Sequence, residues 1–304
     1  MIDILLAVYN GERYLPNLSH SLRAQSCGDF RVLCRDDGSR DGSAALLAGL
    51  EREDKRFRII YGSPSGSASG CFFALLRSSD APYTMFCDQD DIWHADKVEK
   101  TLRAMEEAEA KYGRDTPLLV HSDLRVVDAA LREISPSMMD YQQLCPGRDD
   151  LSRLLCQSLV SGCTMMINAP LRRLINEHPG RDCLMYDWWI SLAAAAFGRI
   201  VWLPEATIDY RQHGGNRVGA KNVRSTAYIL QKIRCGRLSL EGTYRQASAF
   251  AAAFGDILPR QSAERIRGYA ALPEMGKLQR IRSLRRTGTL KCGTLRRLGQ
   301  YWFV

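Results

Sequence analysis

The sequence predicts an α/β fold, a mostly parallel sheet flanked by helices, and three observations support that prediction. The first 125 residues alternate apolar runs with segments of helical periodicity, which is typical of strands joined by crossover helices. Polar motifs follow three of the apolar runs, where sheets of this kind bind their ligands. The chain also has 304 residues and 45% hydrophobic content, enough to fill a sizeable core.

The predicted elements alternate through the first part of the chain. The expected strands are short apolar runs at residues 4–8, 30–35, 57–61, 84–87 and 118–121. The expected helices between them are residues 13–25, 43–52, 71–78 and 95–112. Residues 122–146 are irregular. Beyond them we expect strands at 164–167, 200–203 and 207–211, and helices at 151–158, 187–197, 223–235, 240–254 and 263–271.

The most informative motif is a cluster of acids that follows an apolar strand. Asp88, Asp90 and Asp91 occupy three of four consecutive positions. At about 4 Å and an effective dielectric of about 20, each pair of like charges costs roughly 4 kcal/mol. A divalent cation would relieve this repulsion, and oxygen ligands favour magnesium or manganese, ions that usually bring phosphate with them. The alternative is a polar turn in which Asp90 or Asp91 caps the following helix.

Two further motifs follow strands that are expected to be parallel. Tyr9-Asn10-Gly11 comes after the first strand, and Asp36-Asp37-Gly38-Ser39-Arg40-Asp41 after the second. Because the carboxyl ends of parallel strands meet at one edge of a sheet, we expect both motifs to lie beside the acid cluster. Ordinary turn chemistry remains the alternative for Asp36 and Asp37.

Composition excludes several classes of protein. No apolar run approaches the 18 or so residues that span a bilayer, so we do not expect an integral membrane protein. The first residues enter a strand pattern without a basic region or cleavage site, so we expect no secretory signal. The ten cysteines form no Cys-x-x-Cys pair, and reduced thiols in a cytoplasmic protein explain them best.

The net charge of +8 is carried by residues 275–304, which hold eight Lys or Arg and no acid. Leucines alternate with these basic residues, and Tyr301-Trp302-Phe303 follow. Such a segment is typical of contact with an anionic membrane, where each basic residue contributes about 1 kcal/mol. A solvated helix or a docking face for a protein partner are the alternatives, and we expect no nucleic-acid binding.

Motifs along residues 2–220 together resemble a known family. They are Val8-Tyr9-Asn10-Gly11, Asp36-Asp37-Gly38-Ser39-x-Asp41-Gly42, Asp88-Gln89-Asp90-Asp91-Ile92-Trp93, Asp187-Trp188-Trp189 and Tyr210-Arg211-Gln212-His213-Gly214-Gly215-Asn216. This set resembles the inverting glycosyltransferases of family two, which have the GT-A fold, and is most similar to bacterial rhamnosyltransferase-like members. The resemblance implies a GT-A domain at 1–220, with a nucleotide-binding half at 1–125 and an acceptor-binding half at 126–220. Residues 221–304 lie outside it as a helical, basic C-terminal region.

The resemblance also implies a cofactor and ligands. The cofactor would be Mn²⁺ or Mg²⁺, held by Asp88, Asp90 and His213. The donor would be a nucleotide-sugar, preferably dTDP-rhamnose, with a UDP-hexose as the alternative. The residues expected to bind its nucleotide are Ala7, Val8, Tyr9, Asn10, Asp36, Asp37, Asp88, Gln89 and Arg211. His213 has phosphate contact as an alternative role, and Asn216 is expected to shape a closing loop.

For the catalytic base we expect Asp187. It precedes the apolar run Trp188-Trp189-Ile190, and apolar neighbours raise the pKa of a carboxylate and make it a better base. Helix N-capping is the alternative. The acceptor, a glycan or lipid-linked glycan of the cell surface, is expected to meet Asp91, Trp93, Asp123 and Trp188.

The protein is therefore expected to work in the cytoplasm at the inner face of the cell membrane. A nicotinamide-dependent oxidoreductase would need Gly-x-Gly-x-x-Gly after a strand, and a P-loop enzyme would need Gly-Lys-Ser or Gly-Lys-Thr. The chain has neither motif. A non-catalytic scaffold that binds nucleotide-sugars is the remaining alternative. Metal-dependent release of nucleoside diphosphate separates it from an enzyme.

Overall fold

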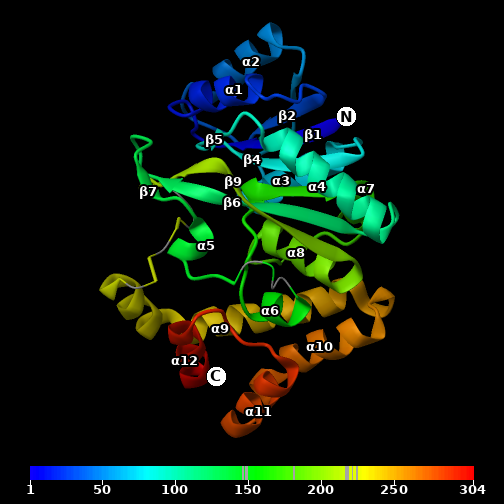
Figure 1. Cartoon of the computed structure of the whole chain (residues 1–304), viewed down its shortest axis with the longest axis vertical. Helices are drawn as coiled ribbons and strands as arrows, with labels where there is room; N and C mark the ends of the chain where they lie inside the picture. Colours follow the sequence, from blue (N-terminus) through cyan, green and yellow to red (C-terminus); the bar gives the residue numbers. More distant parts are fainter. Residues whose placement is uncertain (146, 148–149, 181, 216–218, 221, 224) are drawn as a thin grey trace.

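The computed structural model describes residues 1–145, 147, 150–180, 182–215, 219–220, 222–223 and 225–304. A twisted sheet occupies the upper part of the molecule, and the C-terminal helices gather beneath it (Figure 1). The strands are β1 Ile2–Val8, β2 Phe30–Asp36, β3 Phe57–Ile59, β4 Tyr83–Asp88, β5 Ile92–Trp93, β6 Leu118–Val127, β7 Glu133–Ser135, β8 Met165–Asn168 and β9 Arg199–Arg211.

The sheet is mixed but mostly parallel, as predicted. Its order is β3-β2-β1-β4-β8-β6-β9-β5, with β7 paired to β6. Strands β1 to β4 are parallel to one another where they pair, β8 is antiparallel to both of its neighbours, and β6 and β9 are again parallel. Alternate residues of β1 enter different cores: Ile4 and Leu6 pack on one face and Leu5 on the other. Both faces of the sheet are therefore buried, which requires helices on each side.

The helices are α1 Leu15–Arg23, α2 Ser43–Glu53, α3 Ala68–Ser78, α4 Lys97–Tyr112, α5 Met138–Tyr141, α6 Leu151–Cys156, α7 Ala169–Glu177, α8 Tyr186–Phe197, α9 Thr226–Phe254, α10 Arg260–Ala270, α11 Lys277–Thr287 and α12 Thr294–Phe303. Short 3₁₀ turns occur at Gly162–Thr164, Gly255–Ile257 and Leu272–Glu274. Apolar residues of α1, α2 and α4 fill one core, and those of α3, α6, α7, α8 and α9 fill the other.

Two pairs of elements that the sequence predicted as separate are each continuous in the structure. Residues 199–211 form one strand, because its pairing with β6 shifts register between Ser122 and Asp123 and so accommodates Pro204. Residues 226–254 form one helix through Gly236, where an added Cβ would lie 2.4 Å from the Phe303 ring. That glycine allows α12 to pack closely on α9.

The C-terminal helices share a core with the sheet domain. Phe250 and Phe254 of α9 pack against Trp189 of α8, with ring centroids 4.9 and 5.9 Å away. The division after residue 220 stays a prediction. None of the described helices is long and apolar enough to cross a membrane.

Candidate active site

The three sequence motifs meet at one edge of the sheet. Strands β2, β1 and β4 are neighbours, and their register places Val8 opposite Asp36 and Ala7 opposite Asp88. The loops that follow these strands therefore leave the sheet side by side. The predicted convergence at the carboxyl ends of parallel strands is confirmed.

A cavity of about 1260 Å³ lies over this edge. Its wall contains these residues predicted as site residues: Ala7, Val8, Tyr9, Asp37, Asp88, Gln89, Asp90, Asp187 and Trp188. The wall does not include Asn10, Asp36, Asp91, Trp93, Asp123, Arg211 or His213. Asn216 lies outside the described residues.

Gln89 joins the loop after β1 to the loop after β4. Its Oε1 accepts a hydrogen bond from the Tyr9 backbone N–H (2.8 Å), and its Nε2 donates to the Tyr9 carbonyl (2.9 Å). A Cβ on Gly11 would lie 2.5 Å from Gln89 Oε1, so a larger residue at that position would displace the Gln89 amide. Because the amide is used in this way, Gln89 positions Tyr9, whose side chain is 54% exposed at the cavity.

The loop after β2 is held by its own carboxylates. Both oxygens of Asp36 accept hydrogen bonds from Ser39, and Ser39 Oγ in turn accepts from the Asn10 backbone N–H at 2.8 Å. Asn10 adopts φ 51°, and its Oδ1 accepts from the Arg40 N–H at 2.9 Å. The turn interpretation of Asp36 is thus realised. Asp37 reaches the cavity wall while accepting a hydrogen bond from Ser65 Oγ at 2.7 Å.

His213 and Asp90 are brought together from distant segments. Nε2 of His213 lies 2.8 Å from Asp90 Oδ2, and its Nδ1 accepts a hydrogen bond from the Gly215 N–H at 3.0 Å. The Tyr14 ring stacks on the imidazole with centroids 4.7 Å apart. The ring is therefore oriented on two sides, with Nε2 directed at the carboxylate.

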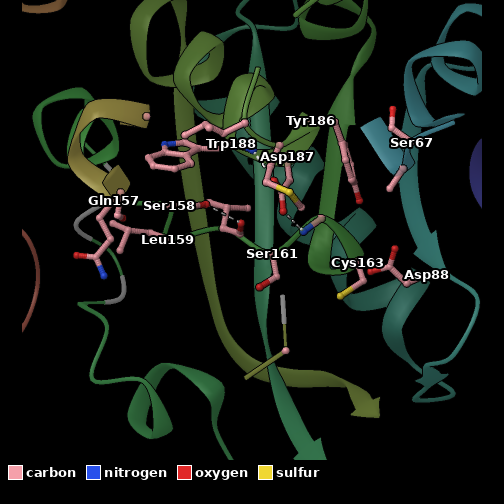
Figure 2. A pocket seen from close by; sticks show the side chains of 18 of the residues that line it. Ser67, Asp88, Gln157, Ser158, Leu159, Ser161, Cys163, Tyr186, Asp187 and Trp188 are labelled. Atoms are coloured by element: carbon pink, nitrogen blue, oxygen red, sulfur yellow. Dashed lines mark hydrogen bonds between the residues drawn. The ribbon is translucent and has the colours of Figure 1, made fainter. Parts of the chain in front are cut away.

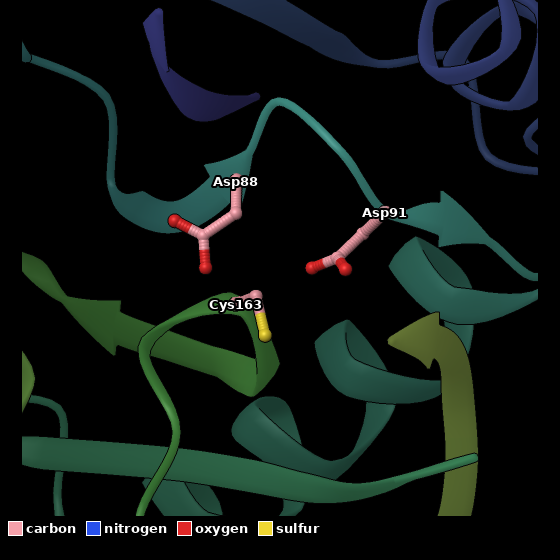
Figure 3. Close-up of side chains that lie close together, drawn as sticks. All are labelled: Asp88, Asp91 and Cys163. Carbon is pink, nitrogen blue, oxygen red and sulfur yellow. The ribbon is translucent and has the colours of Figure 1, made fainter. Parts of the chain in front are cut away.

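Asp88, Asp91 and Cys163 form a second group beside this pair (Figure 3). One ligand atom from each lies within 4.8 Å of the others. Burial raises the pKa of Asp88 to about 7, with further contributions from the charges of Asp90 and Asp187. Burial also raises the pKa of Asp91 and of the Cys163 thiol well above their usual values. The arrangement disfavours the fully ionised cluster unless a cation balances it.

Part of that balance comes from the chain itself. Lys97 is 0% exposed, and its Nζ donates to Thr207 Oγ1 at 3.3 Å and lies 4.6 Å from the Trp93 ring centroid. Burial lowers its pKa to about 8, while the charge of Asp91 acts in the opposite direction. Lys97 therefore places a buried amine near the acid cluster, outside the cavity wall.

Several expectations require correction. Asp91 does not cap a helix, because α4 begins at Lys97 after Asp96 and Asp91 accepts from the Arg211 N–H at 3.2 Å. It is 0% exposed and cannot contact an acceptor in this structure. Arg211 is likewise buried, and its guanidinium lies 5.1 Å from the Tyr14 ring centroid, away from the cavity wall.

Trp93 and Asp123 also lie away from the cavity. Trp93 is 2% exposed in the core. The Asp123 carboxylate accepts hydrogen bonds from the N–H groups of Leu124 (2.8 Å) and Met138 (3.2 Å), and from Ser137 Oγ. The Asp123 carboxylate therefore binds the N-terminus of α5, and these hydrogen bonds explain its burial without a ligand.

Asp187 stands in the first turn of α8 at the cavity wall (Figure 2). Met185 occupies the N-cap position, so the capping interpretation of Asp187 is wrong. Its Oδ2 accepts from the Gly162 N–H at 3.1 Å and its Oδ1 from the Trp188 N–H at 2.7 Å. Burial raises its pKa to about 6. Trp188 lines the cavity beside it, and its Nε1 donates to the Leu154 carbonyl at 2.6 Å.

Sequence reasoning missed Tyr14, Lys97 and Cys163. None of them belongs to a recognisable motif, and each reaches the acid cluster only through tertiary packing. The signal that helped elsewhere, a polar motif directly after a strand, is absent at all three.

Comparison with known proteins identifies the family. Residues 3–115 match the model of glycosyl transferase family 2. A *Bacillus subtilis* protein named as a glycosyltransferase of teichuronic acid biosynthesis is 29% identical over 69% of this chain and 79% of its own length. Residues 3–115 thus carry a glycosyl transferase family 2 domain, and both curated relatives described here are named as glycosyltransferases. A *Shigella flexneri* relative in this family, named a dTDP-rhamnosyl transferase, is 25% identical over 71% of this chain and 74% of its own.

Solved structures show that the chain has the GT-A fold. *Staphylococcus aureus* TarS in complex with UDP-GlcNAc aligns with a TM-score of 0.58 at 16% identity, over 99% of this chain and 86% of that one. A *Pyrobaculum calidifontis* mannosyltransferase in complex with GDP-Man and Mn²⁺ aligns with a TM-score of 0.56 at 14% identity, over 99% and 82% of the two chains.

Proposed function

We propose that this glycosyltransferase moves a sugar from a nucleotide-sugar to an acceptor hydroxyl with inversion, in a metal-dependent reaction. The preferred donor is dTDP-rhamnose, and the acceptor is a bacterial surface polysaccharide or a lipid-linked oligosaccharide. One observation carries the proposal. Asp187 and the pair Asp88 and Asp90 line the same cavity, so a base and a cation site face one bound donor.

The donor set fits a divalent cation. Asp88 and Asp90 offer carboxylate oxygens at the cavity wall, and His213 offers a nitrogen 2.8 Å from Asp90. Asp91 Oδ2 is buried without a hydrogen-bond partner among the described residues. Asp88, Asp90 and His213 would hold Mn²⁺ or Mg²⁺. When bound, the ion would offset charge that develops on the leaving diphosphate.

Asp187 would act as the base. The acceptor oxygen forms a bond to the anomeric carbon as the bond from that carbon to the diphosphate oxygen breaks. The acceptor proton passes to the Asp187 carboxylate, and the nucleoside diphosphate leaves with the bonding electrons. With a pKa of about 6, Asp187 is ionised at neutral pH and is more basic than an ordinary aspartate. Attack opposite the leaving group inverts the anomeric centre.

The donor sugar has two candidates. The *Shigella flexneri* relative is named for dTDP-rhamnose, which favours that donor. TarS was solved with UDP-GlcNAc, which keeps a UDP-hexose as the second candidate. A thermal-shift screen of nucleotide-sugars with and without Mn²⁺ separates them, because a ligand that binds only the folded state raises the melting temperature.

The screen and a transfer assay together test the proposal. We expect manganese-dependent stabilisation by dTDP-rhamnose and manganese-dependent release of dTDP. If nucleotide-sugars stabilise the protein but no nucleoside diphosphate is released with any acceptor glycan tested, the result would support a non-catalytic scaffold. Stabilisation by no nucleotide-sugar would contradict the proposal as a whole.

A peripheral membrane contact is the second part of the proposal. On α12, Leu295, Leu298 and Trp302 form one stripe and are 54%, 60% and 76% exposed. Leu278 of α11 is 72% exposed, and the neighbouring Lys277 Nζ lies 5.8 Å from the Trp302 ring centroid. Leu284 of the predicted apolar face is instead 0% exposed.

Vesicle co-sedimentation tests this contact. We expect binding to vesicles with anionic lipid and weak binding to phosphatidylcholine alone. Leu298→Glu/Trp302→Glu should abolish the binding while Leu131→Glu, an exposed leucine near β7, should not. Equal binding by both variants would contradict the assignment of this face.

A further inference from the structure

We propose that the part of the cavity farthest from Asp88 binds a phosphate or diphosphate that joins the acceptor glycan to an apolar chain. This distal half is defined by Lys291 and by the residues of α9, α12 and segment 157–160 that line the cavity. The inference deepens the proposed function and rests on it, because the glycan must extend from this phosphate toward Asp187.

Charge is segregated along the cavity. The carboxylates in its wall are Asp37, Asp88, Asp90 and Asp187, and none of them belongs to α9, α12 or segment 157–160. Among the described residues, the distal half has no Asp or Glu in its wall. It contributes three cations instead: Arg245 of α9, Lys291 before α12, and Arg296 of α12. Such a surface attracts an anion, whereas a neutral glycan would gain nothing from it.

The cations differ in how firmly they are held. Arg296 donates to Tyr228 Oη at 3.1 Å and to the carbonyls of Gln142 and Gln143, so its guanidinium is fixed in place. Arg245 is exposed on α9 and makes no ion pair with a carboxylate of the described residues. A fixed guanidinium and an exposed one suit a group with several acceptor oxygens, as a phosphate has.

One segment of the wall connects this charge to Asp187, and the glycan would bridge the two. Segment 157–163 runs along the wall: Gln157 Oε1 accepts from the Cys292 N–H at 2.8 Å, next to Lys291, and Gly162 donates to Asp187. Figure 2 shows Gln157 and Leu159 on one side of the view, Asp88 on the other, and Ser161 and Asp187 between them. Six residue steps span at most about 20 Å, which sets an upper limit on the separation between these two contacts.

The distal wall is also apolar, which indicates a lipid next to the phosphate. Leu159, Leu240 and Phe303 line it, and Leu295 carries the wall out to the exposed stripe of α12. An apolar chain bound along this track would bury that stripe, with its phosphate left among the cations. A uronic-acid glycan would satisfy the charge but would leave the apolar wall uncovered.

Calorimetric binding in EDTA tests the proposal with geranyl diphosphate as the probe. EDTA removes divalent ions, so the probe cannot be captured by a cation at Asp90. We expect saturable binding, and binding at least about tenfold weaker for geraniol and for inorganic diphosphate, since each lacks half of the contacts. Arg245→Gln/Lys291→Gln should weaken geranyl diphosphate binding at least about tenfold, and Arg245→Lys should retain most of it.

A matched control comes from the same cavity. Arg40 lines the end of the cavity that faces the strands, so Arg40→Gln should leave the binding of geranyl diphosphate unchanged within about twofold. Equal losses in Arg40→Gln and in the double variant would overturn the proposal, as would binding of a glucuronate oligosaccharide in place of geranyl diphosphate. Manganese-dependent binding of dTDP-rhamnose, measured in parallel, should survive the double variant. If donor binding is absent in the parent protein, the proposed function fails; if only probe binding is absent, this inference alone fails.

Discussion

The imidazole of His213 lies 2.8 Å from the carboxylate of Asp90, and this contact links the segment after β9 to the loop after β4. Gly215 and Tyr14 orient the ring from two sides. The geometry of this proposed cation site therefore depends on the tertiary fold and on no local motif alone.

Replacing His213 with Gln should weaken manganese binding at least about tenfold, because one nitrogen ligand and the orientation of Asp90 are both lost. Isothermal calorimetry with Mn²⁺ measures the change. His94 forms a similar pair with Asp209 at 2.7 Å outside the cavity wall, so His94→Gln serves as the control and should keep the parent affinity. The same loss in both variants would mean that His213 supports the fold only.

Asp187→Asn should lower kcat by about 10² to 10⁴ and leave the Kd for the donor nearly unchanged, because the substitution removes the proton acceptor and keeps the shape of the side chain. Steady-state transfer and donor calorimetry measure the two quantities. Asp182→Asn, an exposed acid nearby in the chain, is the control and should behave like the parent. Parent-like turnover by the Asp187 variant would remove it from the mechanism.

The pH dependence of transfer should follow the same carboxylate. Burial raises the pKa of Asp187 to about 6, and a base acts only when deprotonated. The rate is therefore expected to be highest above about pH 7 and to fall as the pH drops through 6. The residual activity of Asp187→Asn should not show this fall in rate near pH 6.

Gly11→Ala should weaken donor binding and shift Gln89, because the added methyl group would lie 2.5 Å from Gln89 Oε1. Removing the obstacle with Gly11→Ala/Gln89→Ala should give a loss smaller than the sum of the two single losses. Thermal shift with donor and Mn²⁺ measures all three variants. Gly28→Ala, which would meet no atom within 4 Å, is the neutral control. If the loss of donor binding in the double variant equalled the sum of the two single losses, a direct contact between position 11 and Gln89 would be contradicted.

Protein freed of divalent ions should lose stability as the pH rises from about 4 to 7. Burial raises the pKa of Asp88 to about 7, so between these values the folded state binds a proton that the unfolded state has released. Denaturant unfolding in EDTA measures the slope, which Asp88→Asn should reduce and Asp115→Asn, at an exposed acid, should not. Mn²⁺ should raise the melting temperature more at pH 7.5 than at pH 5.

The order of strands and helices could be predicted because each apolar run ends in a turn-forming or charged motif. Elements without such signals were missed. The two-residue strand β5 exists only through its pairing with Asp209 and Ile208, and α7 begins at Ala169 after the N-cap Asn168 with no preceding break in the apolar pattern. Short or uninterrupted segments are determined by their partners, which a single sequence does not display.

The site residues could likewise be predicted only where the position of a strand determines them. Residues at the carboxyl ends of β1 and β4, such as Tyr9 and Asp88, lie at the cavity as expected, because strand register places the two ends side by side. Trp93 and Asp91 follow the same strand yet face inward, since their loop turns back to pair with β9. Which residue of an acid cluster faces a ligand depends on that turn.

Lys97 has a consequence for the electrostatics of the buried acids. Its amine is enclosed between the Trp93 ring and Thr207, and burial lowers its pKa to about 8. As the pH rises past that value the amine loses its charge, and the positive potential that it supplies to Asp91 and the Cys163 thiol is lost with it. A side chain outside the cavity wall thereby ties the potential around the acid cluster to alkaline pH.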